Sequence, residues 1–81
     1  FTTTLASIYP NPVTQGLLNI HLKTVEAPAQ FELINVLGQV VHKELLKNLQ
    51  NILTLPQLEA GFYGVVVTQD NKRFVSKLYI K

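Results

Sequence analysis

The sequence contains no cysteine, methionine or tryptophan. Without cysteine the fold cannot be cross-linked by a disulfide, and a metal site built on thiolates is excluded. A chain of 81 residues suits one small domain, and in such a domain roughly 60% of the surface of the unfolded chain can be buried. We therefore expect one domain over 1–81, in which 1–7 combine the end of a linker with the start of the first strand.

Charged residues are also few. They make up 15% of the chain, and the net charge of +2 is too small to indicate a nucleic acid partner. No Asp, Glu, Lys or Arg precedes Lys23, whereas the last ten positions hold Lys72, Arg73, Lys77 and Lys81. This basic group could contact an anionic surface, or its lysines could protect a terminal edge strand from aggregation. The composition is compatible with both.

Long apolar runs are absent as well. The longest, 62–67, has the length of a strand and falls short of the ~20 residues that a membrane-spanning helix needs. The sequence has no signal peptide, and it begins with Phe1 rather than Met. We therefore expect it to be part of a larger protein.

Short stretches in which apolar and polar residues alternate predict half-buried strands. The stretches 18–22 and 31–33 show this alternation clearly. The residues 36–39 predict a tight turn in which Gly38 is free to adopt a positive φ, with a returning strand from Val40 onward.

The last third of the chain predicts a hairpin. The segment 61–67 is rich in the aromatic and β-branched residues that favour strands, and the pair 70–71 suits a two-residue turn before a strand over 72–80. Alternation places Tyr63 in the core and Phe62 on the opposite face. The second strand then has one face with Phe74, Leu78 and Ile80, and another with Val75, Lys77 and Tyr79.

The segment 41–51, taken alone, is evenly balanced between helix and strand. Val41, Leu45 and Leu49 recur at helical spacing, and its Lys, Glu and Leu residues are good helix formers. The turn expected at Gly38 favours a strand for the first half. Turn signals that recur about every ten residues predict an all-β fold, namely a seven-stranded immunoglobulin-like antiparallel β-sandwich.

Residues that could carry out catalysis are few and scattered. His21 and His42 lie on different predicted strands, where each is expected to point to solvent, and no spaced carboxylate completes a metal or acid–base site. Ser7 and Ser76 belong to no nucleophile motif, and the glycines are too far apart for a phosphate loop. We expect no enzymatic activity, no metal and no cofactor.

The aromatic residues leave a binding function open. Tyr9, Phe62, Tyr63 and Tyr79 could form a platform on which a sugar or a peptide stacks, although core or interface packing is the better explanation for most of them. The alternative function is therefore an immunoglobulin-like binding module, for carbohydrate or protein, appended to a secreted enzyme. Fold alone does not decide between functions.

Several motifs follow one another in a fixed order along the chain. They are "YPNP" at 9–12, a glycine before a strand at Gly16, "NVLGQVV" at 35–41, "LPQLEAGFYGVVV" at 55–67 and a final strand with lysines. Each motif alone is weak. Together, from about Leu5 to Lys81, they resemble the type A C-terminal sorting domain of the type IX secretion system of Bacteroidetes.

This resemblance implies an immunoglobulin-like sandwich at the C-terminus of a secreted cargo protein. After Sec export to the periplasm, such a domain directs the cargo through the outer membrane to the cell surface or the extracellular space. Its partners would be an outer-membrane shuttle, a translocon and a sortase-like cysteine protease. In most cargo the protease then removes the domain, and the cargo is released or joined to anionic lipopolysaccharide. By this resemblance the chain is a signal and a substrate, and it has no catalytic role.

The residues that match the family's motifs are the candidate sorting and recognition residues. They are Tyr9, Pro10, Asn11, Pro12, Gly38, Gln39, Leu58, Gly61, Tyr63, Lys77 and Lys81. Two other positions depart from the family's pattern. Many members have Asp where Asn35 stands, so the resemblance carries no charge-dependent role to this position, and members often have Ser where Pro56 stands.

Elementary physics gives several of these residues a structural role. The two prolines of 9–12 predict a rigid extended corner. Gly61 is expected to supply an unusual backbone angle, Tyr63 to anchor its strand in the core, and Leu58 to cover one end of the sandwich. The terminal lysines and the open edge of the last hairpin are then the candidates for direct recognition by strand addition. The same edges would permit dimers.

Overall fold

The structure, a computed structural model, describes residues 6–9, 13 and 16–81. These residues form seven strands: β1 (Ala6–Tyr9), β2 (Leu17–Leu22), β3 (Ala29–Ile34), β4 (Val40–Leu46), β5 (Gln50–Thr54), β6 (Gly61–Gln69) and β7 (Lys72–Ile80). No helix that could cross a membrane occurs in this described part of the chain.

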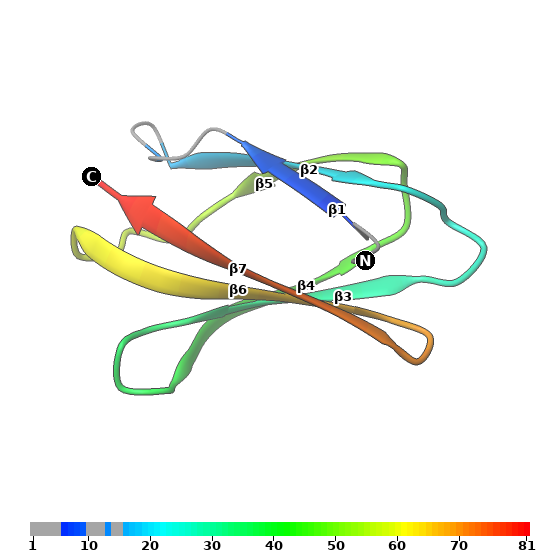
Figure 1. Ribbon diagram of the computed structural model, residues 1–81. Coiled ribbons are helices and arrows are strands. Elements are labelled where there is room, and N and C mark those ends of the chain that lie inside the picture. The colour runs from blue at the N-terminus through cyan, green and yellow to red at the C-terminus, as the bar shows by residue number, and fades with distance from the viewer. Residues whose placement is uncertain (1–5, 10–12, 14–15) are drawn as a thin grey trace.

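The strands form two antiparallel sheets that lie on each other as layers (Figure 1). One sheet has three strands in the order β1-β2-β5, and the other has four in the order β4-β3-β6-β7. Because β4 pairs with β3 while β5 pairs with β2, the chain crosses between the layers after β4. This arrangement is an immunoglobulin-like sandwich, and it confirms the predicted fold class.

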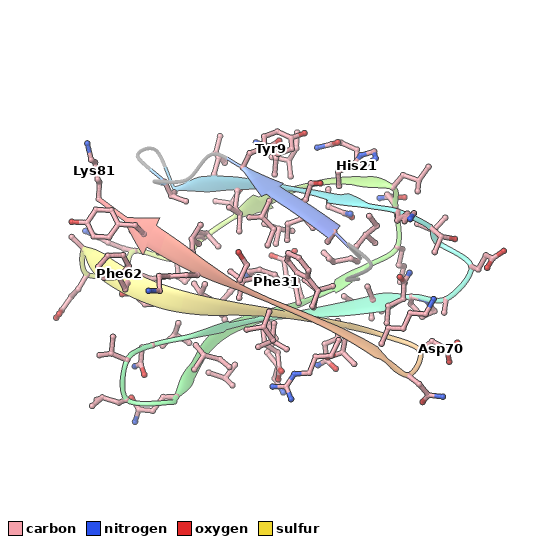
Figure 2. The ribbon with its side chains drawn as sticks, in the orientation of Figure 1. Tyr9, His21, Phe31, Phe62, Asp70 and Lys81 are labelled. Atoms are coloured by element: carbon pink, nitrogen blue, oxygen red, sulfur yellow. The ribbon has the colours of Figure 1, made fainter. Side chains whose placement is uncertain are left out.

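The core lies between the two sheets and takes its side chains from alternate positions of the strands. Leu18, Ile20 and Leu22 of β2 are fully buried in one cluster with Phe31 and Leu33 of β3, and Figure 2 shows Phe31 between the layers. Burial of one such side chain contributes about 1.5–3 kcal/mol. Other buried members of the cluster are Ala6, Val13, Ala29, Leu46, Leu53, Leu55, Val65, Val67, Leu78 and Ile80.

The segment 41–51, which the sequence left balanced between helix and strand, contributes to β4 and β5. Leu45 and Leu49 are 57% and 46% exposed, so the helical spacing corresponds to no common buried face. Leu46 is buried instead, because strand alternation turns it toward the core. The strand predicted for the first half is confirmed, and the end of the segment belongs to the opposite sheet.

Val13 forms backbone hydrogen bonds with the C-terminal end of β7. Its N–H donates to the carbonyl of Tyr79 at 2.8 Å, and its own carbonyl accepts from the N–H of Lys81 at 2.9 Å. These bonds pair Val13 in parallel with Ile80 on the outer edge of β7, and the Val13 side chain is 1% exposed. The open edge predicted for the last hairpin is therefore occupied at its C-terminal end.

Candidate recognition surface

The turn between β3 and β4 is held by Asn35. Its Oδ1 accepts hydrogen bonds from the N–H groups of Leu37 and Gln39, both at 3.0 Å, and its Nδ2 donates to Oε1 of Gln39 at 3.1 Å. Its backbone N–H donates to the Gln39 carbonyl, and its carbonyl accepts from the N–H of Gly38. Gly38 has a φ of +83°, which glycine adopts without strain. The tight turn predicted at Gly38 is confirmed.

The chain segment that leads into β6 is fixed by Tyr63. Its hydroxyl donates to the carbonyl of Glu59 at 2.7 Å, a link back to the preceding loop like the tyrosine corner of immunoglobulin domains. Tyr63 and Leu58 are partly buried and pack against the core. Gly61 enters the strand with a φ of +147°, a value that is almost restricted to glycine. The structural roles predicted for Gly61 and Tyr63 are confirmed.

These two motif segments lie far apart in the sequence, but they line one depression of about 470 Å³. Asn35, Val36 and Leu37 contribute from the turn, and the residues from Gln57 to Tyr63 contribute from the other segment. The β3–β4 turn projects away from the sheets near the start of β6 (Figure 1), and the depression lies between these two segments. The fold therefore brings two of the family's motifs to one place.

The outer face of β6 and β7 lies next to this depression. The ring centroids of Phe62 and Tyr79 are 4.9 Å apart at an interplanar angle of 53°. Nζ of Lys77 lies 5.4 Å from the centroid of the Phe62 ring, within the range of a cation–π contact. Phe62 is 55% exposed whereas Tyr63 packs against the core, so the opposite faces predicted for these two residues are confirmed.

A mostly apolar hollow of about 360 Å³ joins the two regions. Val36, Phe62 and Tyr63 border both the hollow and the depression. None of the residues that line the hollow is acidic, and Lys77 supplies a positive charge. The complete lining is Asn35, Val36, Phe62, Tyr63, Gly64, Val75, Ser76 and Lys77.

Among the described candidate residues, Tyr9 and Lys81 are not part of this lining. Pro10, Asn11 and Pro12 fall outside the described residues, so the corner expected there stays a prediction. Tyr9 lies on the outer side of the three-stranded sheet (Figure 2), where its hydroxyl accepts a hydrogen bond from Nε2 of Gln50 at 2.9 Å. Lys81 follows β7 with an exposed side chain.

The histidines differ from each other. His21 is exposed on β2, as predicted. The prediction that His42 points to solvent is wrong, because His42 pairs with Leu33 on the core-facing side of β4, with 22% of its side chain exposed. Its ring centroid lies 6.3 Å from that of Phe31, and its Nε2 lies 2.9 Å from Oε1 of Glu44. As an edge strand, β4 can carry polar residues on its inner face.

No cluster of His, Asp or Glu that could hold a metal ion occurs among the residues that the structure describes. Val36 and Leu37 are the most exposed of the large apolar residues described, at 81% and 78%, and the sequence pattern placed them in a turn without indicating this exposure. Their position between Asn35 and Gly38, two residue types that favour turns, is the signal that could have identified them.

Residues 7–81 match the model of a protein family described as the Secretion system C-terminal sorting domain. The chain belongs to this family. No curated protein matches it. As a member, the sorting domain is a signal for type IX secretion, and it interacts with that machinery. The protein is secreted toward the cell surface or the extracellular space, and the family is not catalytic.

Proposed function

We propose that this sorting domain carries an upstream cargo protein from the periplasm across the outer membrane by presenting one end of its sandwich to the type IX machinery. The family match over 7–81 is the observation that carries the proposal. The depression at that end supports it, because two motif segments that are distant in the sequence build its walls. Nothing favours the alternative of an immunoglobulin-like binding module.

The candidate residues divide into two roles under this proposal. Three of them shape the recognised end. Leu58 packs against the core, Gly61 supplies the unusual backbone angle, and Tyr63 donates a hydrogen bond to the carbonyl of Glu59. Gly38 and Gln39 complete the turn beside them. Lys77 and Lys81, whose side chains are exposed, contact the machinery directly. The corner expected at 9–12 has an architectural role under this proposal.

The machinery that receives the domain consists of an outer-membrane shuttle, a translocon and a sortase-like cysteine protease. The protease removes the domain after export, and the cargo is then released or joined to anionic lipopolysaccharide. The domain itself is the substrate of these steps.

The isolated domain could also form dimers. The proposed route is strand pairing along the part of β7 that is not bonded to Val13.

A fusion experiment tests the proposed function. Residues 1–81 are placed behind a reporter with a Sec signal in a host that has the type IX machinery, beside a matched fusion to a sorting domain of known activity. We expect both reporters to reach the medium or the cell surface. A reporter that stays in the periplasm with residues 1–81, but leaves with the known domain, would contradict the proposal.

Charge substitutions test the direct role of the two terminal lysines. Truncation from Lys77 is unsuitable, because Leu78 and Ile80 are 1% and 8% exposed in the core and their loss would unfold the sandwich. The double variant Lys77→Gln and Lys81→Gln keeps both side-chain lengths. We expect it to stay folded, with the loss of about 0.5–1 kcal/mol from the Lys77–Phe62 contact. Export should fall about tenfold, which corresponds to about 1.4 kcal/mol of binding free energy.

The matched control is the double variant Lys43→Gln and Lys47→Gln, which removes two exposed charges from β4 and the link after it. Export of the control should equal that of the unmodified fusion. Equal export from both double variants would assign Lys77 and Lys81 no part in recognition.

A further inference from the structure

The tip of the β3–β4 turn exposes two adjacent apolar side chains. Val36 and Leu37, which we call the apolar knob, are 81% and 78% exposed. The turn projects away from the two sheets, so the knob is remote from the core (Figure 1). Single exposed apolar residues are ordinary, but a large contiguous apolar patch marks a site of interaction.

The knob is rigid. The amide and backbone of Asn35 form hydrogen bonds of 2.9–3.1 Å to Leu37, Gly38 and Gln39, which close the turn beneath it. A group that is already fixed in its bound conformation loses little entropy when it binds, and this preorganisation increases affinity. The arrangement suits an anchor that enters a pocket, since a flexible loop would need to be ordered first.

The surface around the knob continues its apolar character and adds one positive charge. Val36 also borders the hollow that contains Phe62 and Val75, which are 55% and 63% exposed. Lys77 is the charged residue of this lining, and it lies against the Phe62 ring. A partner that covers this surface therefore needs an apolar pocket for the knob, and a carboxylate near Lys77 adds electrostatic complementarity.

The chemistry favours a protein over a lipid bilayer as the occupant. Segments that insert apolar residues into anionic membranes place Lys or Arg around those residues. The turn 35–39 has neither, and the single basic residue of the adjoining hollow, Lys77, is balanced by Glu59 in the depression on the other side. We propose that the apolar knob inserts into an apolar pocket of a protein of the export machinery, with a carboxylate of that protein beside Lys77. This inference rests on the proposed function and names the partner's chemistry.

Export of the reporter fusion tests the knob. The double variant Val36→Ser and Leu37→Ser removes exposed apolar surface and leaves Asn35, Gly38 and Gln39 in place. We expect its thermal midpoint to equal that of the unmodified domain and its export to fall about tenfold, as for the loss of a binding hot spot. The matched control is Leu45→Ser with Ile52→Ser, two residues that are 57% and 65% exposed elsewhere on the sandwich and whose loss should leave export unchanged.

Each outcome decides something different. If the unmodified fusion is not exported, the proposed function falls and the knob inference falls with it. If the unmodified fusion and the knob variant are exported equally, only the knob inference is wrong. Flotation with vesicles of phosphatidylethanolamine and phosphatidylglycerol tests for a lipid occupant. If the unmodified domain binds the vesicles and the knob variant does not, the choice of a protein partner is overturned.

Discussion

At the scale of single residues, Asn35 shows how a turn is held without a charge. Its Oδ1 accepts from two backbone N–H groups, and a carboxylate in the same place could accept from both. Hydrogen-bond acceptance therefore explains why Asn35 can stand where the family that the chain resembles often has Asp. A net charge is not required.

Two substitutions of Asn35 test this explanation. Asn35→Ala removes the acceptor and should lower the free energy of unfolding by about 1 kcal/mol. Asn35→Asp keeps the acceptor and loses only the bond from Nδ2 to Gln39, so its stability should stay close to that of the unmodified chain. Urea unfolding of the 81-residue chain measures both. An equal loss in the two variants would show that the Nδ2 bond, and not Oδ1, holds the turn.

Two glycines of β6 should respond to alanine in opposite directions. Gly61 has a φ of +147°, so Gly61→Ala should destabilise the domain by about 1–2 kcal/mol. Gly64 has no positive φ, and a Cβ added there would meet nothing closer than the Ile34 carbonyl at 4.0 Å. Gly64→Ala should therefore stabilise the domain by about 0.5–1 kcal/mol. The midpoints of thermal unfolding give both signs, and a stabilising Gly61→Ala would contradict the backbone argument.

At the scale of elements, the hairpin of β6 and β7 organises the end of the sandwich that we propose the machinery recognises. Its first residues carry Gly61, Phe62 and Tyr63, and its last residues pair with them and place Lys77 and Tyr79 beside Phe62. The loop before β6 is tied to the hairpin through Tyr63 and Glu59. The shape of the depression therefore depends on how firmly this loop is attached.

Tyr63→Phe isolates that attachment. The variant keeps the ring that packs against the core and removes only the bond to the Glu59 carbonyl. We expect the free energy of unfolding to fall by about 1 kcal/mol, the typical contribution of one hydrogen bond. Faster amide exchange in the loop 55–60 should accompany the loss. Unchanged stability together with unchanged exchange would show that packing alone positions the loop.

At the scale of the whole molecule, much of the fold could be predicted from alternation and turn chemistry. The hairpin 61–80 followed from its β-branched residues and from the pair at 70–71, and the strand 18–22 followed from its period of two. Pattern could not show that Val13 pairs with Ile80, because a parallel bridge between distant residues leaves no local periodicity. His42 was misplaced for a related reason, since the inner face of edge strand β4 is not purely apolar.

The depression at the proposed recognition end was predictable only in part. Motif order identified Gly38, Leu58, Gly61 and Tyr63 as candidates, but not that their segments line one depression. That proximity depends on the long-range pairing of β3 with β6, which local sequence does not encode. The sequence placed Val36 and Leu37 in the turn 36–39 but did not indicate their 81% and 78% exposure, because turn signals describe the backbone and not the burial of the side chains.

The most direct test of the central claim is the distribution of the reporter fused to residues 1–81 in two otherwise identical hosts, one with the type IX translocon and one without it. The sorting function predicts a reporter at the cell surface or in the medium of the first host, and a reporter retained in the periplasm of the second. Retention in both hosts, or release from both, would contradict it.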